Sequence, residues 1–290
     1  MDKGWRWELN NNLREINPPT PFLSGPLTII RNMIRRRRIV YNFIRRDIRL
    51  KYRNSSFGYF WSLLEPLLLS GVYFILFTII SERPREDYAF LVVLGVISWS
   101  FFSRALRASI VSLTNNEMMI KQVYLPREIF AVTSVGSNLV ITFFSLFMSI
   151  PFIIYFDISL NQNLLLVPVG LLILAILSLG IGLMMSWINA INRDIEHLFA
   201  VITRAGFFLS PVMWTIEMVI ERSPDTGLQY ALLNPVVVPI TMIRNGLTGE
   251  EFPDEIKLIW ILYSVFFSIL SFILGSMLFK KMEPVVIKKL

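Results

Sequence analysis

The sequence predicts an all-α integral membrane protein with six transmembrane helices. The first observation is composition: 54% of the 290 residues are hydrophobic and 17% are charged, whereas soluble domains carry about 25% charged residues. The second is that apolar residues form long runs, with no charged residue from Ile129 to Phe156 or from Leu258 to Phe279. A run of about 18 or more apolar residues makes a helix long enough to cross the hydrocarbon core of a bilayer. The mean hydropathy of +0.57 agrees with this class.

The expected spans are Trp61–Ile80, Tyr88–Leu113, Ile129–Phe156, Leu164–Ile188, Leu198–Ile216 and Leu258–Phe279. In the fourth span Ser178, Gly182 and Ser186 recur every four residues. Small residues at this spacing allow helices to approach closely, and we expect the stripe to pack within the bundle. Cysteine is absent, which excludes disulfides and Cys-based metal sites.

The distribution of Lys and Arg predicts the orientation of the spans. Of the 28 such residues, 22 fall within 1–60, 103–128, 189–197 and 280–290, and five fall within 81–87, 157–163 and 217–257. Because loops rich in Lys and Arg stay in the cytoplasm, both termini are predicted to be cytoplasmic. The expected organisation is a cytoplasmic extension (1–32), an interface helix (33–56), a transmembrane domain (57–283) and a cytoplasmic tail (284–290).

A basic amphipathic segment precedes the first span. Residues 31–53 contain ten Lys or Arg, and the segment has one apolar edge formed by the helical spacing of Val40, Ile44, Ile48 and Tyr52. Such a helix is expected to lie in the membrane surface, with its apolar edge in the acyl boundary and its cations near anionic headgroups. Its candidate functional cations are Arg45, Arg46, Arg49, Lys51 and Arg53. The run Arg35–Arg38 alone could suggest nucleic-acid binding; in a multi-span protein topology control is the better interpretation, and no nucleic-acid partner is expected.

An irregular apolar stretch lies between the fifth and sixth spans. Residues 230–243 are too short to cross a membrane, and Asn234, Pro235 and Pro239 interrupt them. A re-entrant hairpin of two short helices is the natural interpretation, with an ordinary interfacial helix as the alternative. Backbone at that depth must be buried in protein or line a wet cavity, so the stretch indicates a pore or gate on the outer side.

The sequence offers little catalytic chemistry. The one histidine, His197, lies beside acidic residues in a short loop and is expected to be solvated rather than a metal ligand. Glu65 and Arg204 are charges within predicted spans and therefore functional candidates. No Gly is followed by Lys, so the phosphate-binding G-x-x-x-x-G-K-[ST] loop is absent. If ATP powers this protein, a separate polypeptide must hydrolyse it.

Aromatic side chains in the first two spans are candidates for contacting a substrate. The set comprises Tyr73, Phe74, Trp99, Phe101 and Phe102. A line of aromatic faces could stack on sugar rings and guide a glycan; lipid-facing or helix-packing aromatics are the alternative for each residue.

A series of short motifs then resembles one family. In order, these are Arg45–Arg53 with Ser56-Phe57-Gly58, Trp61 and Pro66; Gly95 with Trp99 and Phe101-Phe102; Asn116 followed by Lys121–Glu128; Asn192–Ile195; Ser210-Pro211-Val212; and Asn234-Pro235 with Arg244. The ordered set, on a six-span scaffold, resembles the ABC-2 type permeases that export polysaccharide, O-antigen or teichoic acid. The resemblance covers about residues 40–283, and the first thirty residues depart from it.

The resemblance implies a homodimer that pairs with two ATPase subunits, which bind the ATP and Mg²⁺. The chain would be a transport subunit, not an enzyme, with no cofactor of its own. It would move a lipid-linked polysaccharide, such as O-antigen, capsule or wall teichoic acid, across the cytoplasmic (inner) membrane. The loop 115–128 would couple to the ATPase through Asn116, Glu117, Lys121, Tyr124, Pro126, Arg127 and Glu128. The stretch 230–243 would form the outer gate.

Three other functions stay open at this point. An ABC-2 type exporter of a drug or small lipid would share the scaffold and differ in the role of the aromatic residues. A membrane glycosyltransferase would need a catalytic cluster that the sequence does not display. An ion channel is a further possibility, which conductance measurements would detect.

Overall fold

The computed structural model describes residues 24–289 except 54, 81–86, 124, 160, 224–225 and 255. Within these residues the regular secondary structure is helical, with no strand. The helices are α1 (Gly25–Arg35), α2 (Arg37–Lys51), α3 (Trp61–Ile80), α4 (Tyr88–Ile110), α5 (Ser112–Asn115), α6 (Glu117–Gln122), α7 (Glu128–Ser145), α8 (Ser149–Tyr155), α9 (Leu166–Ile191), α10 (Asp194–Leu209), α11 (Ile216–Arg222), α12 (Thr226–Leu232), α13 (Val237–Thr248) and α14 (Leu258–Lys289). Short 3₁₀ turns at Gly58–Phe60, Leu146–Met148 and Gln162–Leu165 join some of them.

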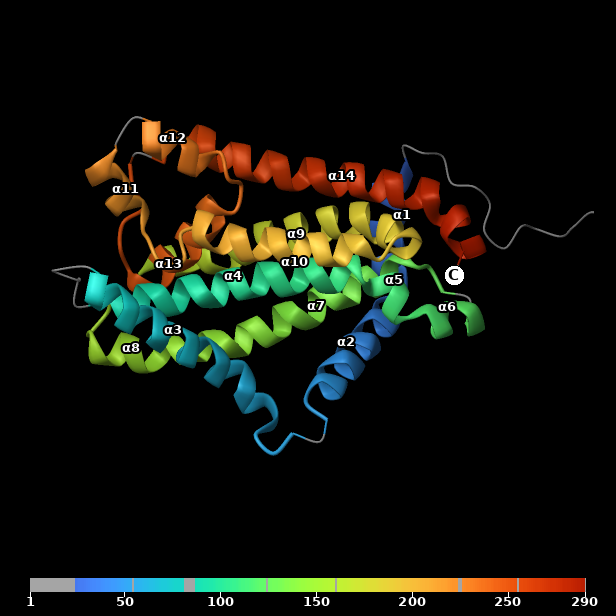
Figure 1. Ribbon diagram of the computed structural model, residues 1–290, viewed down its shortest axis with the longest axis horizontal. Helices are drawn as coiled ribbons and strands as arrows, with labels where there is room; N and C mark the ends of the chain where they lie inside the picture. Colours follow the sequence, from blue (N-terminus) through green and yellow to red (C-terminus); the bar gives the residue numbers. More distant parts are fainter. Residues whose placement is uncertain are drawn as a thin grey trace, which may run out of the picture.

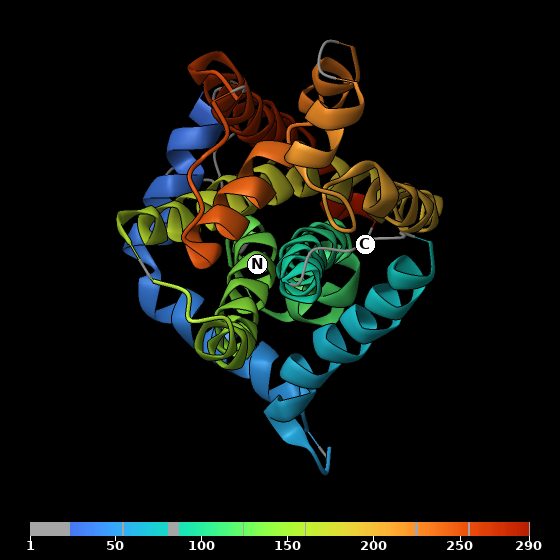
Figure 2. The same ribbon diagram turned by 90° about the vertical axis from the view of Figure 1, so that its left-hand side faces the viewer.

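The long helices α4, α7, α9 and α14 run lengthwise beside one another (Figure 1). Seen end-on, α4 lies in the middle of the bundle and α3 leans away from it (Figure 2). Close approach of α9 and α14 depends on Gly180 and Gly275, because a Cβ on either would collide with the backbone of the other helix. A Cβ on Gly182 would collide with Ser109 of α4. The small-residue stripe of the fourth predicted span therefore packs within the bundle, as expected.

Among the residues that the structure describes, four helical segments are long and apolar enough to cross a membrane: Tyr88–Ile110, Glu128–Tyr155, Gln162–Ile191 and Leu258–Val286. They correspond to the second, third, fourth and sixth predicted spans. The bent pair α12 and α13 gives a fifth candidate if the two count as one span. The first predicted span is helical over its whole length as α3, while α10 has 16 residues and ends at Leu209, before the predicted end at Ile216. For these two segments a crossing stays a prediction.

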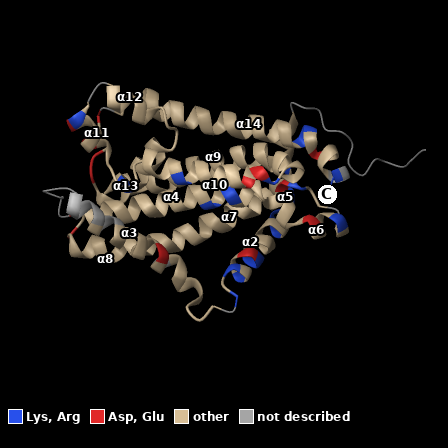
Figure 3. Ribbon diagram, in the orientation of Figure 1, with Lys and Arg blue, Asp and Glu red and all other residues tan. Residues whose placement is uncertain are grey.

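The two ends of the bundle differ in charge (Figure 3). One end carries α1, α2, α5, α6 and the last turns of α14, and Lys and Arg gather there; we call it the basic end. The opposite end carries α8, α11, α12 and the start of α14. The basic end therefore collects the segments that the positive-inside rule places in the cytoplasm.

The N-terminal basic segment differs from the single helix predicted over 33–56. It forms two helices separated at Arg36, whose backbone leaves the helical region at φ −108° and ψ 26°. α1 packs on α14, with Ile29 fully buried and Gly25 against the backbone of Ser276 and Met277. α2 ends at Lys51 and packs along α7.

The apolar edge of α2 contacts protein. Ile44 lies so close to Gly136 of α7 that a Cβ there would be 2.8 Å from its Cδ1 atom. Phe43 contacts Phe130 of α7, with ring centroids 5.7 Å apart. Ile44 of the predicted edge therefore packs on α7, as does the neighbouring Phe43, and burial of the edge in the acyl boundary stays a prediction.

At the opposite end, α12 and α13 meet at 94° across a break at residues 233–236. Asn234 holds the break: its amide donates to Ser210 Oγ at 3.0 Å and its carbonyl oxygen accepts from the Val236 N–H at 3.2 Å. α13 is buried along its length, Pro239 included. Two short helices with a break at Asn234-Pro235 are present as expected, whereas Pro239, expected to interrupt the stretch, lies within α13. That the pair re-enters the membrane stays a prediction.

Candidate functional site

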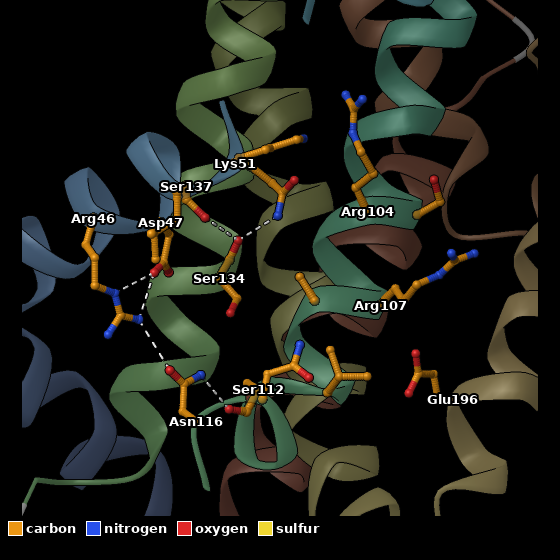
Figure 4. A pocket seen from close by; sticks show the side chains of 16 residues that line it. Arg46, Asp47, Lys51, Arg104, Arg107, Ser112, Asn116, Ser134, Ser137 and Glu196 are labelled. Carbon is orange, nitrogen blue, oxygen red and sulfur yellow. Dashed lines mark hydrogen bonds and ion pairs between the residues drawn. The ribbon is translucent and has the colours of Figure 1, made fainter. Parts of the chain in front are cut away.

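A cavity of about 730 Å³ opens at the basic end. It is lined by α2, α4 and α7, with further residues from α5 and the start of α10 (Figure 4). Four cations face it, together with two carboxylates and several small polar side chains; the charged members are Arg46, Lys51, Arg104, Arg107, Asp47 and Glu196. We call it the basic cavity.

Helical periodicity places these side chains together. From α2, Asp47 and Lys51 are four residues apart and so share a face, and Arg46 lines the cavity beside Asp47. From α4, Arg104 and Arg107 likewise point to one side. α7 contributes Ser134, Ser137 and Asn138, which leaves its wall of the cavity uncharged.

Arg46 ties α2 to the loop that follows α5. Its guanidinium pairs with Asp47, with Nη2 2.8 Å from Oδ1, and donates to Asn116 Oδ1 at 3.3 Å. It also lies over the Phe43 ring, 4.3 Å from the centroid. The Asn116 amide in turn donates to the Ser112 carbonyl at 2.8 Å. Arg46 and Asn116 therefore fix the position of this loop against the cavity wall.

Arg104 has two N–H groups that are not used in hydrogen bonds within the described residues. Its Nη1 pairs with Glu65 Oε2 of α3 at 3.3 Å. Its Nε and Nη2 are buried, and neither has a hydrogen-bond partner among the residues that the structure describes. A buried cationic donor without a partner is costly, so these two N–H groups suit an anionic ligand.

Lys51 adds to the positive field at the same place. Burial lowers the pKa of its ammonium group, and the positive charge of Arg104 lowers that pKa further, with partial compensation from Glu65. Bringing a negative ligand between Lys51 and Arg104 would relieve this repulsion. The chemistry of the arrangement therefore suits an anion.

The loop beside the cavity reaches outward from the basic end. Met118 and Val123 are exposed, and Glu117 pairs with Lys121 one turn later, 2.7 Å from its Nζ. Tyr124 lies outside the described residues. These features leave α6 accessible to a partner protein.

The end of this loop turns inward. Arg127 pairs with Glu283 of α14 at 3.0 Å, and fully buried Glu128 pairs with Lys280 of α14 at 2.8 Å. Of the predicted coupling residues, Asn116, Glu117 and Lys121 thus lie at or near the surface. Glu128 lies beyond the reach of a partner.

A family model described as "ABC-2 type transporter" matches residues 40–248. The chain belongs to the ABC-2 type transporter family. It is 23% identical over 254 residues to an O-antigen export system permease protein RfbA of Myxococcus xanthus, covering 83% of this chain and 95% of that protein. An RfbA protein of Klebsiella pneumoniae is 24% identical over 212 residues, covering 71% and 80% of the two chains. The polysialic acid transport protein KpsM of Escherichia coli is 24% identical over 250 residues, covering 82% and 91%.

Three of the five aromatic residues predicted to contact substrate in this ABC-2 chain are internal. Phe101 is fully buried, and Trp99 and Phe102 are 7% and 6% exposed. Trp99 packs on Gly206 of α10, where a Cβ would lie 2.7 Å from the indole ring. The side chains of Tyr73 and Phe74 lie outside the described residues. Helix packing accounts for the three described aromatics, and contact of the set with a substrate stays a prediction.

Arg244 has a structural role in this ABC-2 chain that could not be predicted from the sequence. Its buried guanidinium donates to the backbone carbonyls of Pro211 at 2.8 Å, Trp214 at 3.2 Å and Leu91 at 3.3 Å. It thereby fastens the segment after α10 to α4 and α13. Nothing in the sequence around Arg244 indicates that its side chain donates to backbone carbonyls, because these carbonyls belong to residues far away in the sequence.

The remaining candidates fall on the surface. His197 and Arg204 are exposed, and Glu65, 57% exposed, serves Arg104 from α3. Within the described part of the chain no group of three or more His, Cys, Asp and Glu could hold a metal ion.

Proposed function

We propose that this chain is the transmembrane subunit of an ATP-driven exporter of lipid-linked polysaccharide. The observation that carries the proposal is the basic cavity, with its unpaired Arg104 donors, in a member of the ABC-2 family. The similar proteins of other bacteria are named for the export of O-antigen and polysialic acid. The substrate class of this chain follows from that similarity together with the chemistry of the cavity.

The cavity suits the headgroup of a polyprenyl phosphate or diphosphate carrying a sugar. Ligand sites commonly occupy about 300–1,000 Å³, and the 730 Å³ here exceeds what a phosphate alone needs. Phosphate oxygens would accept from Arg104 and Lys51 as charge-assisted hydrogen bonds. Small polar side chains of α7 on the other wall are compatible with sugar hydroxyls.

The motor in this proposal is a separate pair of ATPase subunits, bound to a homodimer of this chain. The sequence has no phosphate-binding loop, so ATP and Mg²⁺ would be held by the partner. α6 is the proposed docking element, because Met118 and Val123 expose apolar surface beside the Glu117–Lys121 pair. The positive-inside rule puts this end, with both termini, in the cytoplasm.

Gentle purification from the native membrane tests the partnership. We expect a P-loop ATPase to co-purify with the chain, and the Met118→Asp variant to lose it while the Tyr155→Asp variant at the exposed far end keeps it. Absence of any ATPase under several mild detergents would remove the coupling role.

Deletion of the gene tests the cargo. We expect lipid-linked polymer to build up inside the cell while its amount at the surface falls. An exporter of a drug or small lipid, the alternative function, would leave the polymer at the surface unchanged. The two functions are therefore separated by one measurement of polymer on each side of the membrane.

A further inference from the structure

Four charged side chains meet in a buried cluster where the proposed docking loop ends. Lys280 Nζ lies 2.8 Å from Glu128 Oε2 and 3.1 Å from Glu283 Oε2, and Arg127 Nη1 lies 3.0 Å from Glu283 Oε1. The side chain of Glu128 is 0% exposed, Lys280 5%, Glu283 6% and Arg127 12%. Asn32 of α1 donates to the second oxygen of Glu128 at 2.8 Å. We call these four charged residues the buried charge cluster.

The cluster is balanced in charge, and its carboxylate oxygens are all hydrogen-bonded. Two cations face two carboxylates, and each of the four carboxylate oxygens accepts a hydrogen bond. Apolar Leu113, Ile120 and Phe279 lie beside it. Because the surroundings have low polarity, a displacement of one helix by an ångström or more would leave a charge unpaired.

Stability alone is a weak reason for such a cluster. Replacing a buried ion pair by well-packed apolar residues is often neutral or stabilising, whereas removing one partner is strongly destabilising. What a closed ionic network adds is a defined position for the elements that it joins. The elements joined here are the start of α7, the last turns of α14 and the end of α1. The bonded residues are 96 to 156 positions apart in the sequence.

The far end of α14 reaches the break between α12 and α13. Ser264 Oγ donates to the Pro235 carbonyl at 2.6 Å, and Tyr263 OH donates to the Leu233 carbonyl at 3.0 Å. Between Lys280 and Ser264 the helix runs about 24 Å at 1.5 Å per residue. Along this length Gly180 and Gly275 hold α14 close against α9, so a rigid-body movement of α14 would carry α9 with it.

We infer that the buried charge cluster is the joint that transmits movement of the docking loop along α14 to the α12–α13 break. The inference rests on the proposed function, since it needs an ATPase that moves the loop. Arg127, Glu128, Lys280 and Glu283 are positioning residues in this account. They contact neither ATP nor the substrate, and they set how far the two ends of the molecule move together.

The test uses an apolar version of the cluster. The variant Arg127→Met, Glu128→Met, Lys280→Met and Glu283→Met removes both signs of charge together, and the flexible Met side chains fill the space. Because no charge is left unpaired, we expect the variant to fold and bind the ATPase. The control variant Arg193→Gln with Asp194→Asn alters an exposed, oppositely charged pair at the basic end.

Movement at the far end is the readout, and the absence of cysteine makes it simple. Tyr230→Cys places one thiol on α12, where the residue is 71% exposed. In proteoliposomes holding the complex, its reaction rate with a maleimide is measured with ATP and with ADP. We expect a nucleotide-dependent rate in the parent and control proteins, a nucleotide-independent rate in the apolar variant, and export about tenfold lower in that variant.

The outcomes separate this inference from the proposed function. If the apolar variant keeps both the nucleotide dependence and the export of the parent, the cluster is not the joint, although the proposed function stands. If the variant does not fold, Lys280→Met with Glu128→Gln is measured instead, with the same two expectations. If the parent protein binds no ATPase at all, the proposed function fails first.

Discussion

Among single residues, Arg104 is the one whose surroundings most clearly call for a ligand. It is the only side chain in the basic cavity, within the described part of the chain, for which two buried N–H groups have no hydrogen-bond partner. Its one ion pair, to Glu65 at 3.3 Å, is long and half solvated. Such a pair contributes little on its own, so an incoming phosphate can replace it at small cost.

Replacing Arg104 should weaken binding of the lipid phosphate. We expect Arg104→Gln to bind a polyprenyl diphosphate in detergent roughly 10- to 100-fold more weakly, because a hydrogen bond to a charged group contributes about 1.5–3 kcal/mol. Binding of the uncharged polyprenol should not change. The matched variant Glu65→Gln removes the competing carboxylate and should bind the diphosphate at least as well as the parent. Equal affinity of parent and Arg104→Gln would contradict an anion site here.

Lys51 gives the same site a dependence on pH. Its pKa is lowered, by burial first and then by Arg104, so its charge is lost at a lower pH than for an ordinary lysine. Below that lowered pKa the ammonium group attracts phosphate; as pH rises through it the attraction disappears. We expect affinity for the polyprenyl diphosphate to fall on the alkaline side, and Lys51→Arg to abolish that fall because arginine stays charged. An identical pH profile for the two proteins would exclude Lys51 from the site.

At the scale of elements, the contact of α4 with the segment after α10 organises the opposite end. Gly95 of α4 lies against Val212, where a Cβ would be 2.6 Å from the carbonyl oxygen and 3.0 Å from Arg244 Nη2. The first of these neighbours is backbone and cannot rotate away. The single glycine therefore permits both the packing of α4 and the Arg244 cap.

Gly95→Ala should destabilise the protein by about 1–3 kcal/mol, the usual cost of overpacking. Thermal unfolding in detergent measures the effect. Gly71→Ala in α3 is the control, since a Cβ there meets nothing within 4 Å and alanine is the better helix former. If both substitutions leave the unfolding temperature unchanged, the close contact at Gly95 is not present.

The sequence predicted helices well where long apolar runs dominate, as for α4, α7, α9 and α14. It could not predict the break at Arg36, because the hydrophobic spacing continues through it and the packing of α1 on α14 is a long-range contact. The buried charge cluster was hidden for the same reason: Glu128 and Lys280 are 152 residues apart, and each resembles an ordinary charge at the end of a span. Of the cations that line the basic cavity, Arg46 and Lys51 were predicted as members of an interface helix rather than of a cavity, and Arg104 and Arg107 were not singled out.

At the scale of the whole molecule, the asymmetry of charge between the two ends makes a prediction about orientation. Because the chain has no cysteine, one introduced thiol reports on one place. Met118, 73% exposed, marks the basic end, and Tyr155, 82% exposed on α8, marks the other. A membrane-impermeant maleimide applied to intact cells should label Tyr155→Cys and leave Met118→Cys unlabelled until the cells are opened. Labelling in the reverse order would overturn the orientation.

Transport by the purified complex tests the central claim most directly. The chain and its ATPase are placed in proteoliposomes with a glycan-bearing polyprenyl diphosphate, and movement of the glycan across the bilayer is followed with ATP or with ADP. The account predicts ATP-dependent movement by the parent complex and a strong loss in Arg104→Gln while Arg204→Gln, exposed away from the cavity, behaves as the parent. No ATP-dependent movement by the parent, or parental rates in Arg104→Gln, would contradict it.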